Sequence, residues 1–352
     1  MDLSAPIAWL VDEASAASGP NRFLAELGGR LLADGLPLAG ASLTLAAPHP
    51  IVARRTWLWR AETGAVTEAL GFAGEAPKRA GHDWLRGLGP IEEAVVGPGS
   101  DGPVLGFAGT RSFDRTEAGR LREVARFAAA PLAALAARVT LTALLEAYLG
   151  RRSAAQVQAG ALRRGTGEAI HAALLFADLR GFTALSETTE PRAVIAALDA
   201  WFERVAGGVH AFGGEVLKFI GDGLLAIFPV TGTPAEACEA ALRAVAAARA
   251  GMAHLNGMRE GQGLPPLSFG MAVHLGEILW GNIGAADRLD FTAIGPAVNL
   301  VSRLEGLCRP LGRPVLISGA VADLTTTPLL PLGEHRLRGI DMACAVFTLP
   351  DA

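Results

Sequence analysis

The chain has 352 residues, a length that at roughly 100 to 200 residues per domain favours two domains. Apolar residues make up 51% of the chain and charged residues 19%, a balance that excludes an intrinsically disordered protein. The formal net charge of −4 is too close to neutral to indicate a nucleic acid or an anionic membrane as a partner.

The cysteines and the N-terminal residues indicate a reducing, cytoplasmic setting. Cys238, Cys308 and Cys344 are odd in number and far apart, so they predict neither a disulfide framework nor a cysteine-rich zinc site. The longest uninterrupted apolar run, residues 127–137, has 11 residues and contains Pro131, and it is too short to cross a bilayer. With no basic leader segment, we expect a cytoplasmic protein without a membrane partner.

The first part of the chain predicts a small α+β domain. Its expected elements are one helix and three strands, at residues 21–32, 40–45, 56–60 and 104–108. His49 and His82 stand alone in sequence, without a nucleophile to activate, so this domain is typical of a sensor and not of a catalyst. Its helix-and-strand start and the pattern around Ser112-Phe113 resemble a GAF-type sensor, and another small α+β sensory fold is the alternative.

A helical connector follows this domain. Apolar positions spaced by three and four over residues 115–158 predict helix, which we expect Pro131 to kink or divide. Its first half either packs on the sheet of its own domain or pairs with a second copy in a dimer, and both interpretations stay open. The expected parts of the chain are a sensory domain, a helical linker or transducer and a larger domain, at residues 1–136, 137–164 and 165–352.

Strands and helices alternate in the larger domain. In chain order we expect a strand, a helix, two strands, a helix and a strand, at residues 171–179, 192–212, 214–220, 224–230, 234–255 and 267–274. Gly221-Asp222-Gly223 joins the two central strands, and Asp-Gly between apolar runs is a strong hairpin signal. This β-α-β-β-α-β order is that of the ferredoxin-like fold, followed here by short strands and a helix that begins near Pro296. The expected fold class is therefore α+β.

Two carboxylates fall at neighbouring points of that fold. Asp178 ends the first strand of the larger domain, and Asp222 lies at the tip of the hairpin. The strand and the hairpin are sheet neighbours, so we expect the two side chains to converge. Converging carboxylates suit Mg²⁺, which prefers hard oxygen ligands. For either aspartate alone, a helix cap or a turn residue is the simpler interpretation, but together they favour a metal site.

Four motifs occur in order in this domain. They are FADLRGFT, FGGEVLKFIGDGLLAIF, GNIG and DFTAIGPAVNLVSRLE, at residues 176–183, 212–228, 281–284 and 290–305. Together they resemble the catalytic domain of class III nucleotidyl cyclases, most closely the bacterial adenylate cyclases, and the resemblance covers residues 165–352. It implies conversion of ATP or GTP to a 3′,5′-cyclic nucleotide and pyrophosphate, by attack of the ribose 3′-hydroxyl on the α-phosphorus.

The resemblance also implies a two-metal site. Two Mg²⁺ or Mn²⁺ ions would be held by Asp178, Asp222 and the backbone carbonyl of Leu179. Unpaired N–H groups at the start of a helix point at anions, and here they would cradle the triphosphate. The residues that would supply these amides are Gly181, Phe182 and Thr183.

The resemblance implies, in addition, how the base is read. Lys218, assisted by Thr292, matches the residue that reads adenine, whereas guanylate cyclases typically carry Glu at the first position. The chemistry agrees, because an ammonium donates to the adenine N1 acceptor while guanine presents a donor at N1. Lys78 and Lys218 are the only lysines among 31 basic residues, so a retained lysine indicates a need for a compact ammonium. A lysine solvated on an edge strand is the alternative.

The remaining matches concern the ribose and the phosphates. Asn299 and Arg303 match the pair that positions the ribose and stabilises the pentavalent phosphorus, and their i, i+4 spacing places both on one helix face. Arg338 matches a residue that contacts the terminal phosphates. Pro296 stands where the family often has Asp, and Pro is well tolerated in the first turn of a helix.

The family builds each site from two subunits, so the resemblance implies a C2 homodimer with two equal sites. The sequence thus predicts an adenylate cyclase for intracellular signal transduction, with ATP as substrate and an unidentified ligand or partner at the N-terminal domain. The alternatives are a guanylate cyclase, and a catalytically silent module that binds nucleotide or dimerises.

Overall fold

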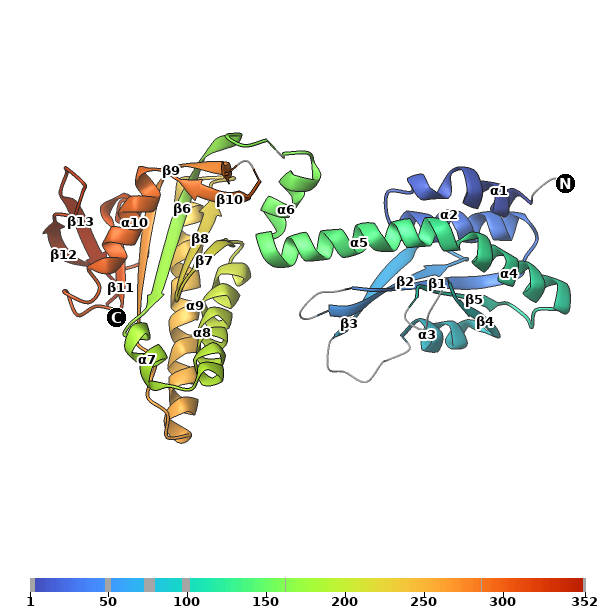
Figure 1. The fold of residues 1–352 in the computed structure, drawn as a ribbon, viewed down its shortest axis with the longest axis horizontal. Helices are drawn as coiled ribbons and strands as arrows, with labels where there is room; N and C mark the ends of the chain where they lie inside the picture. The colour runs from blue at the N-terminus through green and yellow to red at the C-terminus, as the bar shows by residue number, and fades with distance from the viewer. Residues whose placement is uncertain are drawn as a thin grey trace. The chain divides into compact units, whose positions relative to one another are not determined.

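The computed structural model describes residues 4–47, 52–72, 80–96, 102–161, 163–285 and 287–350. The chain forms two compact units, Met1–Tyr148 and Leu149–Ala352 (Figure 1). Each unit has its own sheet and its own hydrophobic core. His49 and Lys78 lie outside the described residues.

The N-terminal unit is built on a five-stranded antiparallel sheet in the order β3-β2-β1-β5-β4. Its strands are β1 (Leu38–Ala46), β2 (Val52–Arg60), β3 (Val66–Phe72), β4 (Ile91–Val95) and β5 (Val104–Gly109). Its first helices are α1 (Ala5–Asp12), α2 (Pro20–Ala33) and α3 (Ala80–Leu88), with a 3-10 turn at Ala14–Ala16. The expected strands are confirmed as β1, β2 and β5 and the expected helix as α2, while β3, β4, α1 and α3 were not predicted.

The core of this unit joins the sheet to α2. Trp57 and Trp59 on β2 are 4% and 3% exposed, and they share a face as the period of a strand requires. Leu24 and Leu27 of α2 are fully buried in the same cluster. Burial of each such apolar side chain stabilises the unit by about 1.5 to 3 kcal/mol, so these residues hold α2 on the sheet.

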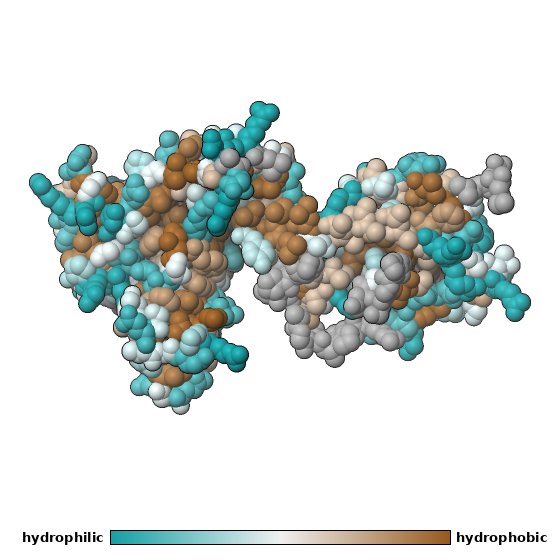
Figure 2. All heavy atoms as spheres, in the orientation of Figure 1, coloured by the Kyte–Doolittle hydropathy of each residue, from teal (hydrophilic) through white to brown (hydrophobic). Residues whose placement is uncertain are grey.

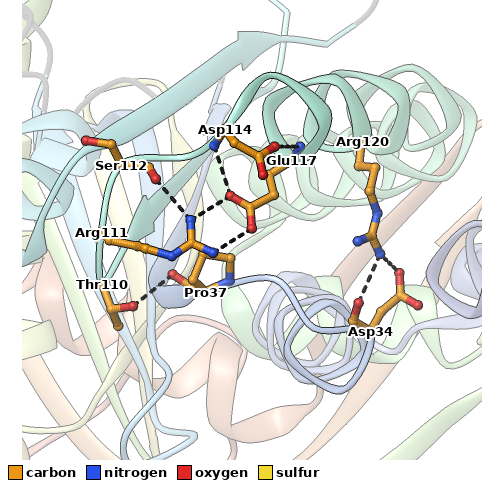
Figure 3. Close-up of polar contacts among 8 residues, drawn as sticks. All are labelled: Asp34, Pro37, Thr110, Arg111, Ser112, Asp114, Glu117 and Arg120. Carbon is orange, nitrogen blue, oxygen red and sulfur yellow. Dashed lines mark hydrogen bonds and ion pairs between the residues drawn. The ribbon is translucent and has the colours of Figure 1, made fainter.

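A polar network fastens α4 (Arg115–Phe127) to the rest of the unit (Figure 3). The Asp114 side chain accepts from the Glu117 N–H at 2.8 Å, and the Glu117 side chain accepts from the Asp114 N–H at 2.9 Å, a capping box that begins the helix. The Arg111 guanidinium donates to both Glu117 oxygens, at 2.9 and 2.8 Å. One turn farther along the helix, Arg120 donates to the carboxylate of Asp34, which follows α2.

The expected long helix is three helices, α4, α5 (Ala129–Leu149) and α6 (Arg151–Gln158). The first break lies at Ala128, between α4 and α5, which confirms that the helix is divided at Pro131. Pro131 cannot donate to the carbonyl of Phe127, the last residue of α4, and it is tolerated in the first turn of α5. The first half of α5 packs in the core of its own unit, which confirms the simpler of the two interpretations. Its residues in that core include Leu132, Leu135 and Val139.

By length and apolar composition alone, α5 is long enough to cross a membrane. The sequence does not predict this, because its longest uninterrupted apolar run, residues 127–137, is too short. Two observations weaken this as evidence for a span. One face of the first half of α5 packs in the N-terminal core, although only 22% of the apolar window is buried. Arg138, near the middle of the helix, donates to the carbonyls of Ser15 and Ala17 at 3.1 and 3.2 Å. Core helices of soluble proteins pass the same test.

The C-terminal unit contains an eight-stranded mixed sheet. Seven strands follow the order β12-β13-β11-β9-β6-β8-β7, and β10 pairs with β9. The strands are β6 (Gly167–Leu179), β7 (Glu215–Ile220), β8 (Gly223–Pro229), β9 (Phe269–Gly284), β10 (Leu289–Ile294), β11 (Val315–Ser318), β12 (Leu330–His335) and β13 (Cys344–Thr348). The segment β9-β6-β8-β7 is antiparallel and has the ferredoxin-like order, which confirms the expected plan.

Helices cover both faces of this sheet (Figure 1). They are α7 (Phe182–Thr188), α8 (Pro191–Ala211), α9 (Pro234–Gly261), α10 (Pro296–Gly306) and α11 (Gly319–Ala322). One face of β6, with Leu175, packs in a core with α8 and α9, and the other, with Leu174, packs in a core with α10. Burial on both faces explains why β6 is a continuous apolar run and not an alternating one.

The Glu117 interactions generate a pH-dependent prediction. Hydrogen bonds from the Arg111 guanidinium and from the Asp114 N–H hold the pKa of the Glu117 carboxyl at about 2, below its usual 4.5. A carboxyl with a lowered pKa stabilises the fold above its unfolded pKa, and this contribution is lost as the pH falls through the folded pKa. We therefore expect Glu117→Gln to lower the free energy of unfolding near neutral pH, and the difference from the wild type to shrink between pH 4.5 and about 2.

Urea unfolding followed by circular dichroism at several pH values measures this difference. Glu123→Gln, at an exposed position of the same helix, is the matched control and should change the midpoint little. A Glu117→Gln effect that stays constant over the whole acid range would contradict the assignment.

Candidate active site

Strand pairing brings Asp178 and Asp222 together. β6 pairs with β8 up to Ala177, directly before Asp178, and the Ile220–Gly223 pair closes the turn that carries Asp222. The Asp178 Oδ1 atom lies against the same turn, since a Cβ built at Gly223 would meet it at 3.1 Å. The two carboxylates therefore face one another at the end of β6, as the sequence predicts.

The two carboxylates share a half-buried position. Burial first, and the charge of Asp222 second, raise the pKa of Asp178 to about 6, while the Arg180 guanidinium acts in the opposite direction. A cation bound between the two carboxylates would reduce the repulsion between them. Carboxylate and backbone carbonyl oxygens are the donors that Mg²⁺ and Mn²⁺ prefer, so the residues present fit a divalent metal.

A buried tryptophan holds the turn that carries Asp222. The Trp201 Nε1 atom, on α8, donates to the Asp222 carbonyl oxygen at 3.0 Å. Trp201 is fully buried, and its ring stacks on Phe269 with a centroid separation of 5.7 Å. Gly221, with φ of +63°, supplies the left-handed residue of the turn. The backbone of the turn is therefore anchored to the core, while the Asp222 carboxylate lies beside Asp178.

The segment after Asp178 starts α7. Leu179 is 4% exposed, and Gly181, with φ of +72°, takes the left-handed conformation at the N-cap of α7. Phe182 and Thr183 form the first turn of this seven-residue helix. The structure thus places the expected carbonyl and the three expected amides in one short segment beside the aspartates.

A buried ion pair links this segment to α10. The Arg180 Nη2 atom donates to the Glu305 backbone oxygen at 3.0 Å and also to the Glu305 carboxylate. The Glu305 side chain is only 6% exposed and that of Arg180 is 23% exposed. Burial raises the pKa of Glu305 to about 7, while the charge of Arg180 acts in the opposite direction.

A second ion pair lies at the edge strand β7. The Lys218 Nζ atom donates to the carboxylate of Asp290 on β10. The side chains are 31% and 50% exposed, so solvent screening keeps this pair weak. Thr292, two residues farther along β10, is half-buried. The ammonium of Lys218 is thus held on the surface where β7 and β10 meet.

The other predicted residues lie apart from the aspartates. Asn299 and Arg303 are exposed on one face of α10, one turn apart. Arg338 is exposed in a turn after β12, next to Gly339 with φ of +79°. Within the described ranges of the chain, no hydrogen bond or ion pair joins these three side chains to Asp178 or Asp222. Helix α10 begins at Pro296, in agreement with the sequence.

Four residues of this neighbourhood have no role in the sequence interpretation, namely Arg180, Trp201, Asp290 and Glu305. A signal for Glu305 is present, because its i, i+4 spacing from Val301 places a charge on the buried face of α10, where a charge needs a partner. The Trp201 and Asp290 contacts join segments 21 and 72 residues apart in sequence. Local periodicity carries no information on such pairs.

The C-terminal unit is similar to known catalytic domains. The family model described as adenylate and guanylate cyclase catalytic domain matches residues 168–343, half of the chain. Adenylate cyclase 1 of Rhizobium meliloti is 31% identical over 175 residues, which cover 49% of this chain and 26% of that protein. The adenylate cyclase of Anabaena cylindrica is 33% identical over 159 residues, which cover 44% of this chain and 31% of that protein. The matched part of the chain spans less than a third of the length of these curated relatives.

A solved structure extends the comparison to the fold. The structure of a bacterial light-regulated adenylyl cyclase matches 89% of this chain and 94% of that chain, with a TM-score of 0.55 and 19% identity. At this identity the likeness shows the fold alone. Taken with the family match and with the two aspartates at the end of β6, it leads to one assignment. The chain belongs to the class III nucleotidyl cyclases, with a catalytic domain of the adenylate and guanylate cyclase family and an additional N-terminal α+β domain.

Proposed function

We propose that the chain is an adenylate cyclase that converts ATP to 3′,5′-cyclic AMP and pyrophosphate in a C2 homodimer. The observation that carries the proposal is the pair of aspartates held side by side between β6 and the β7–β8 hairpin, with Lys218 on the same hairpin. The proposed setting is the cytoplasm, where ATP and divalent cations are abundant.

The aspartates would hold the metals. Two Mg²⁺ or Mn²⁺ ions, bound by Asp178, Asp222 and the Leu179 carbonyl, would supply Lewis acidity toward the 3′-hydroxyl and charge neutralisation at the phosphates. Trp201 keeps the Asp222 backbone fixed, so the carboxylates need little reorganisation on binding. The first amides of α7 lie in the same segment and are available to the triphosphate oxygens.

The reaction needs a positioned ribose and a stabilised phosphorane. The bond from O3′ to the α-phosphorus forms while the bond from that phosphorus to the pyrophosphate oxygen breaks, and the 3′-hydroxyl loses its proton. Arg303 would stabilise the charge on the pentavalent phosphorus with a rigid, permanently charged guanidinium. Asn299, one helical turn earlier, would orient the ribose. Arg338 would contact the terminal phosphates from its exposed turn.

The base pocket favours adenine. The Lys218 ammonium can only donate, and adenine N1 can only accept. One observation supports GTP as the second candidate, because the Asp290 carboxylate beside Lys218 is an acceptor of the kind that guanine N1–H requires. The choice between ATP and GTP therefore depends on whether Lys218 or Asp290 contacts the base.

Apolar side chains on the hairpin side of the unit support the dimer. Phe219 and Ile220 on β7 are 54% and 48% exposed, and Leu279 and Ile294, a cross-strand pair of β9 and β10, are each 45% exposed. Figure 2 shows that apolar areas interrupt the hydrophilic surface of the unit on the side drawn. A second copy would cover such side chains and would bring its own α10 to the aspartates.

The N-terminal unit is proposed to be the sensor, of GAF type or of another small α+β type, for a ligand or partner still to be identified. Residues 137–164 would transmit its signal. The Glu215 carboxylate, on β7, accepts from the Arg152 N–H at 2.9 Å at the start of α6, so the linker contacts the strand that carries Lys218. Movement of α6 would therefore reach the base pocket through a single strand.

The metal site is tested by product formation. Full-length protein is incubated with ATP or GTP in Mg²⁺ and then in Mn²⁺, and the cyclic nucleotide is quantified. We expect cyclic AMP from the wild type and a loss on the order of 100-fold or more in Asp222→Ala, because charge stabilisation at the phosphates is removed. Asp199→Ala, at an exposed position of α8, is the control. A folded wild type that makes no cyclic nucleotide under any of these conditions would favour the silent module.

Base recognition is tested by exchanging the pocket residues. Lys218→Glu combined with Thr292→Cys replaces the donor that meets adenine N1 by an acceptor for guanine N1–H. We expect the ratio of kcat/KM for GTP to that for ATP to rise at least tenfold. A ratio equal to that of the wild type would refute the role of Lys218 in reading the base.

The shared site is tested by complementation. Asp222→Ala and Asn299→Ala homodimers are each expected to be inactive. A mixture in equal amounts forms half of its dimers as heterodimers, and each heterodimer has one intact site, so about a quarter of the wild-type activity should return. Activity no higher than the sum of the two separate variants would mean that each chain builds its site alone.

A further inference from the structure

We propose that Arg180 and Glu305 form a positioning pair that fixes the metal half of one active site to the ribose-binding and phosphate-binding half of the other. The proposal rests on the proposed function, because it assumes that the two halves of a site come from two chains. Neither residue is expected to contact the nucleotide. Each would act through residues near it in sequence, Asp178 on one side and Arg303 on the other.

The pair connects two functional segments of one chain. Arg180 follows Asp178 by two residues, and Glu305 follows Arg303 by two residues on α10. The Arg180 Nη2 atom binds both the backbone oxygen and the carboxylate of Glu305, so it holds the helix itself and not only a side chain. The contact therefore ties the end of β6 to α10.

The neighbouring strand leaves room for this pair. Gly270 on β9 lies opposite Asp178 in the sheet. A Cβ atom at Gly270 would overlap both the Arg180 guanidinium and the Glu305 carboxylate, so any larger residue there would displace the contact. Glycine at position 270, opposite Asp178, thus leaves the space that the Arg180–Glu305 pair occupies.

Burial of the pair also has a cost in folding free energy. Glu305 is 5% exposed and shares the buried face of α10 with Val301 and Leu304. A charge in such a place loses its hydration, and replacement of a buried ion pair by apolar residues is frequently neutral or stabilising. Packing alone would favour an apolar residue at this position. A role in positioning two functional segments explains why a charged pair stands there.

In a homodimer, the Arg180–Glu305 pair would couple the two active sites. In the proposed assembly, the aspartates of one chain serve the first site, and α10 of the same chain serves the second. Metal binding at the first site orders the segment that bears Asp178, and the Arg180–Glu305 contact transfers this order to Arg303 at the second site. The two sites would then be coupled through a contact within each chain.

The heterodimer of the Asp222→Ala and Asn299→Ala chains separates the effect on metal binding from the effect on Arg303. Its one intact site takes the aspartates from the Asn299→Ala chain and α10 from the Asp222→Ala chain. Glu305→Gln is added to one chain at a time. In the chain that supplies α10, we expect kcat to fall about tenfold with little change in the KM for ATP, because Arg303 is misplaced. In the chain that supplies the aspartates, we expect the Mn²⁺ concentration for half-maximal activity to rise several-fold. Equal effects of the two placements, or no effect of either, would overturn the proposal.

A double variant separates positioning from charge and from folding. Arg180→Met with Glu305→Met leaves the net charge unchanged and replaces the buried pair by apolar side chains of similar length, so the fold is expected to survive. Thermal unfolding checks this. In the chain that supplies α10, the double variant should still lower kcat about tenfold. A double variant with the kcat of the wild type would show that the pair only packs.

Direct metal binding distinguishes failure of this proposal from failure of the proposed function. Mn²⁺ binding to the full-length wild type and to the double variant is measured by electron paramagnetic resonance, without turnover. A wild type that binds Mn²⁺ but makes no cyclic nucleotide would refute the proposed function alone. The double variant is expected to bind Mn²⁺ several-fold more weakly even then, and equal affinities would overturn the positioning pair.

Discussion

The repulsion between Asp178 and Asp222 is the constraint on which the catalytic unit depends. β6 pairs with β8 up to the residue before Asp178, so the sheet holds the two carboxylates close together. The guanidinium nearest to them, that of Arg180, is already bound by Glu305. A proton or a cation from solution can balance the charge, and hard oxygen donors favour a divalent cation. The pairing of three strands thus creates the carboxylate pair on which the proposed metal site rests.

The parts of the fold that are visible in the sequence are those with a local cause. The run of small and large apolar residues in β6, the Asp-Gly turn and the spacing of α8 and α9 each depend on neighbours in the chain, and their order identifies the ferredoxin-like core. The convergence of Asp178 and Asp222 follows from that order. Strands β3 and β4 are not predicted, because their alternation is weak at the two opposite, partly exposed edges of the N-terminal sheet.

The parts that remain hidden depend on contacts between distant segments. Pro131 predicts that the helix is divided, but the exact residue at which α4 ends depends on where the next helix begins, because a proline is tolerated in a first turn. The partner of Lys218 is Asp290, 72 residues away, and the family motifs contain both residues without indicating that they meet. The roles of Asn299, Arg303 and Arg338 stay predictions, because they concern a nucleotide and a second chain.

The scarcity of lysine has a practical consequence for work on this protein. Apart from the α-amino group, amine-selective reagents have only Lys78 and Lys218 as targets in the whole chain. The Lys218 amine donates to the Asp290 carboxylate, and this contact competes with a reagent for the nitrogen atom. The extent of its covalent labelling, determined by mass spectrometry of one peptide, would report how often that ion pair opens. Lys218 is thus a natural labelling site, which requires neither an engineered residue nor a nucleotide analogue.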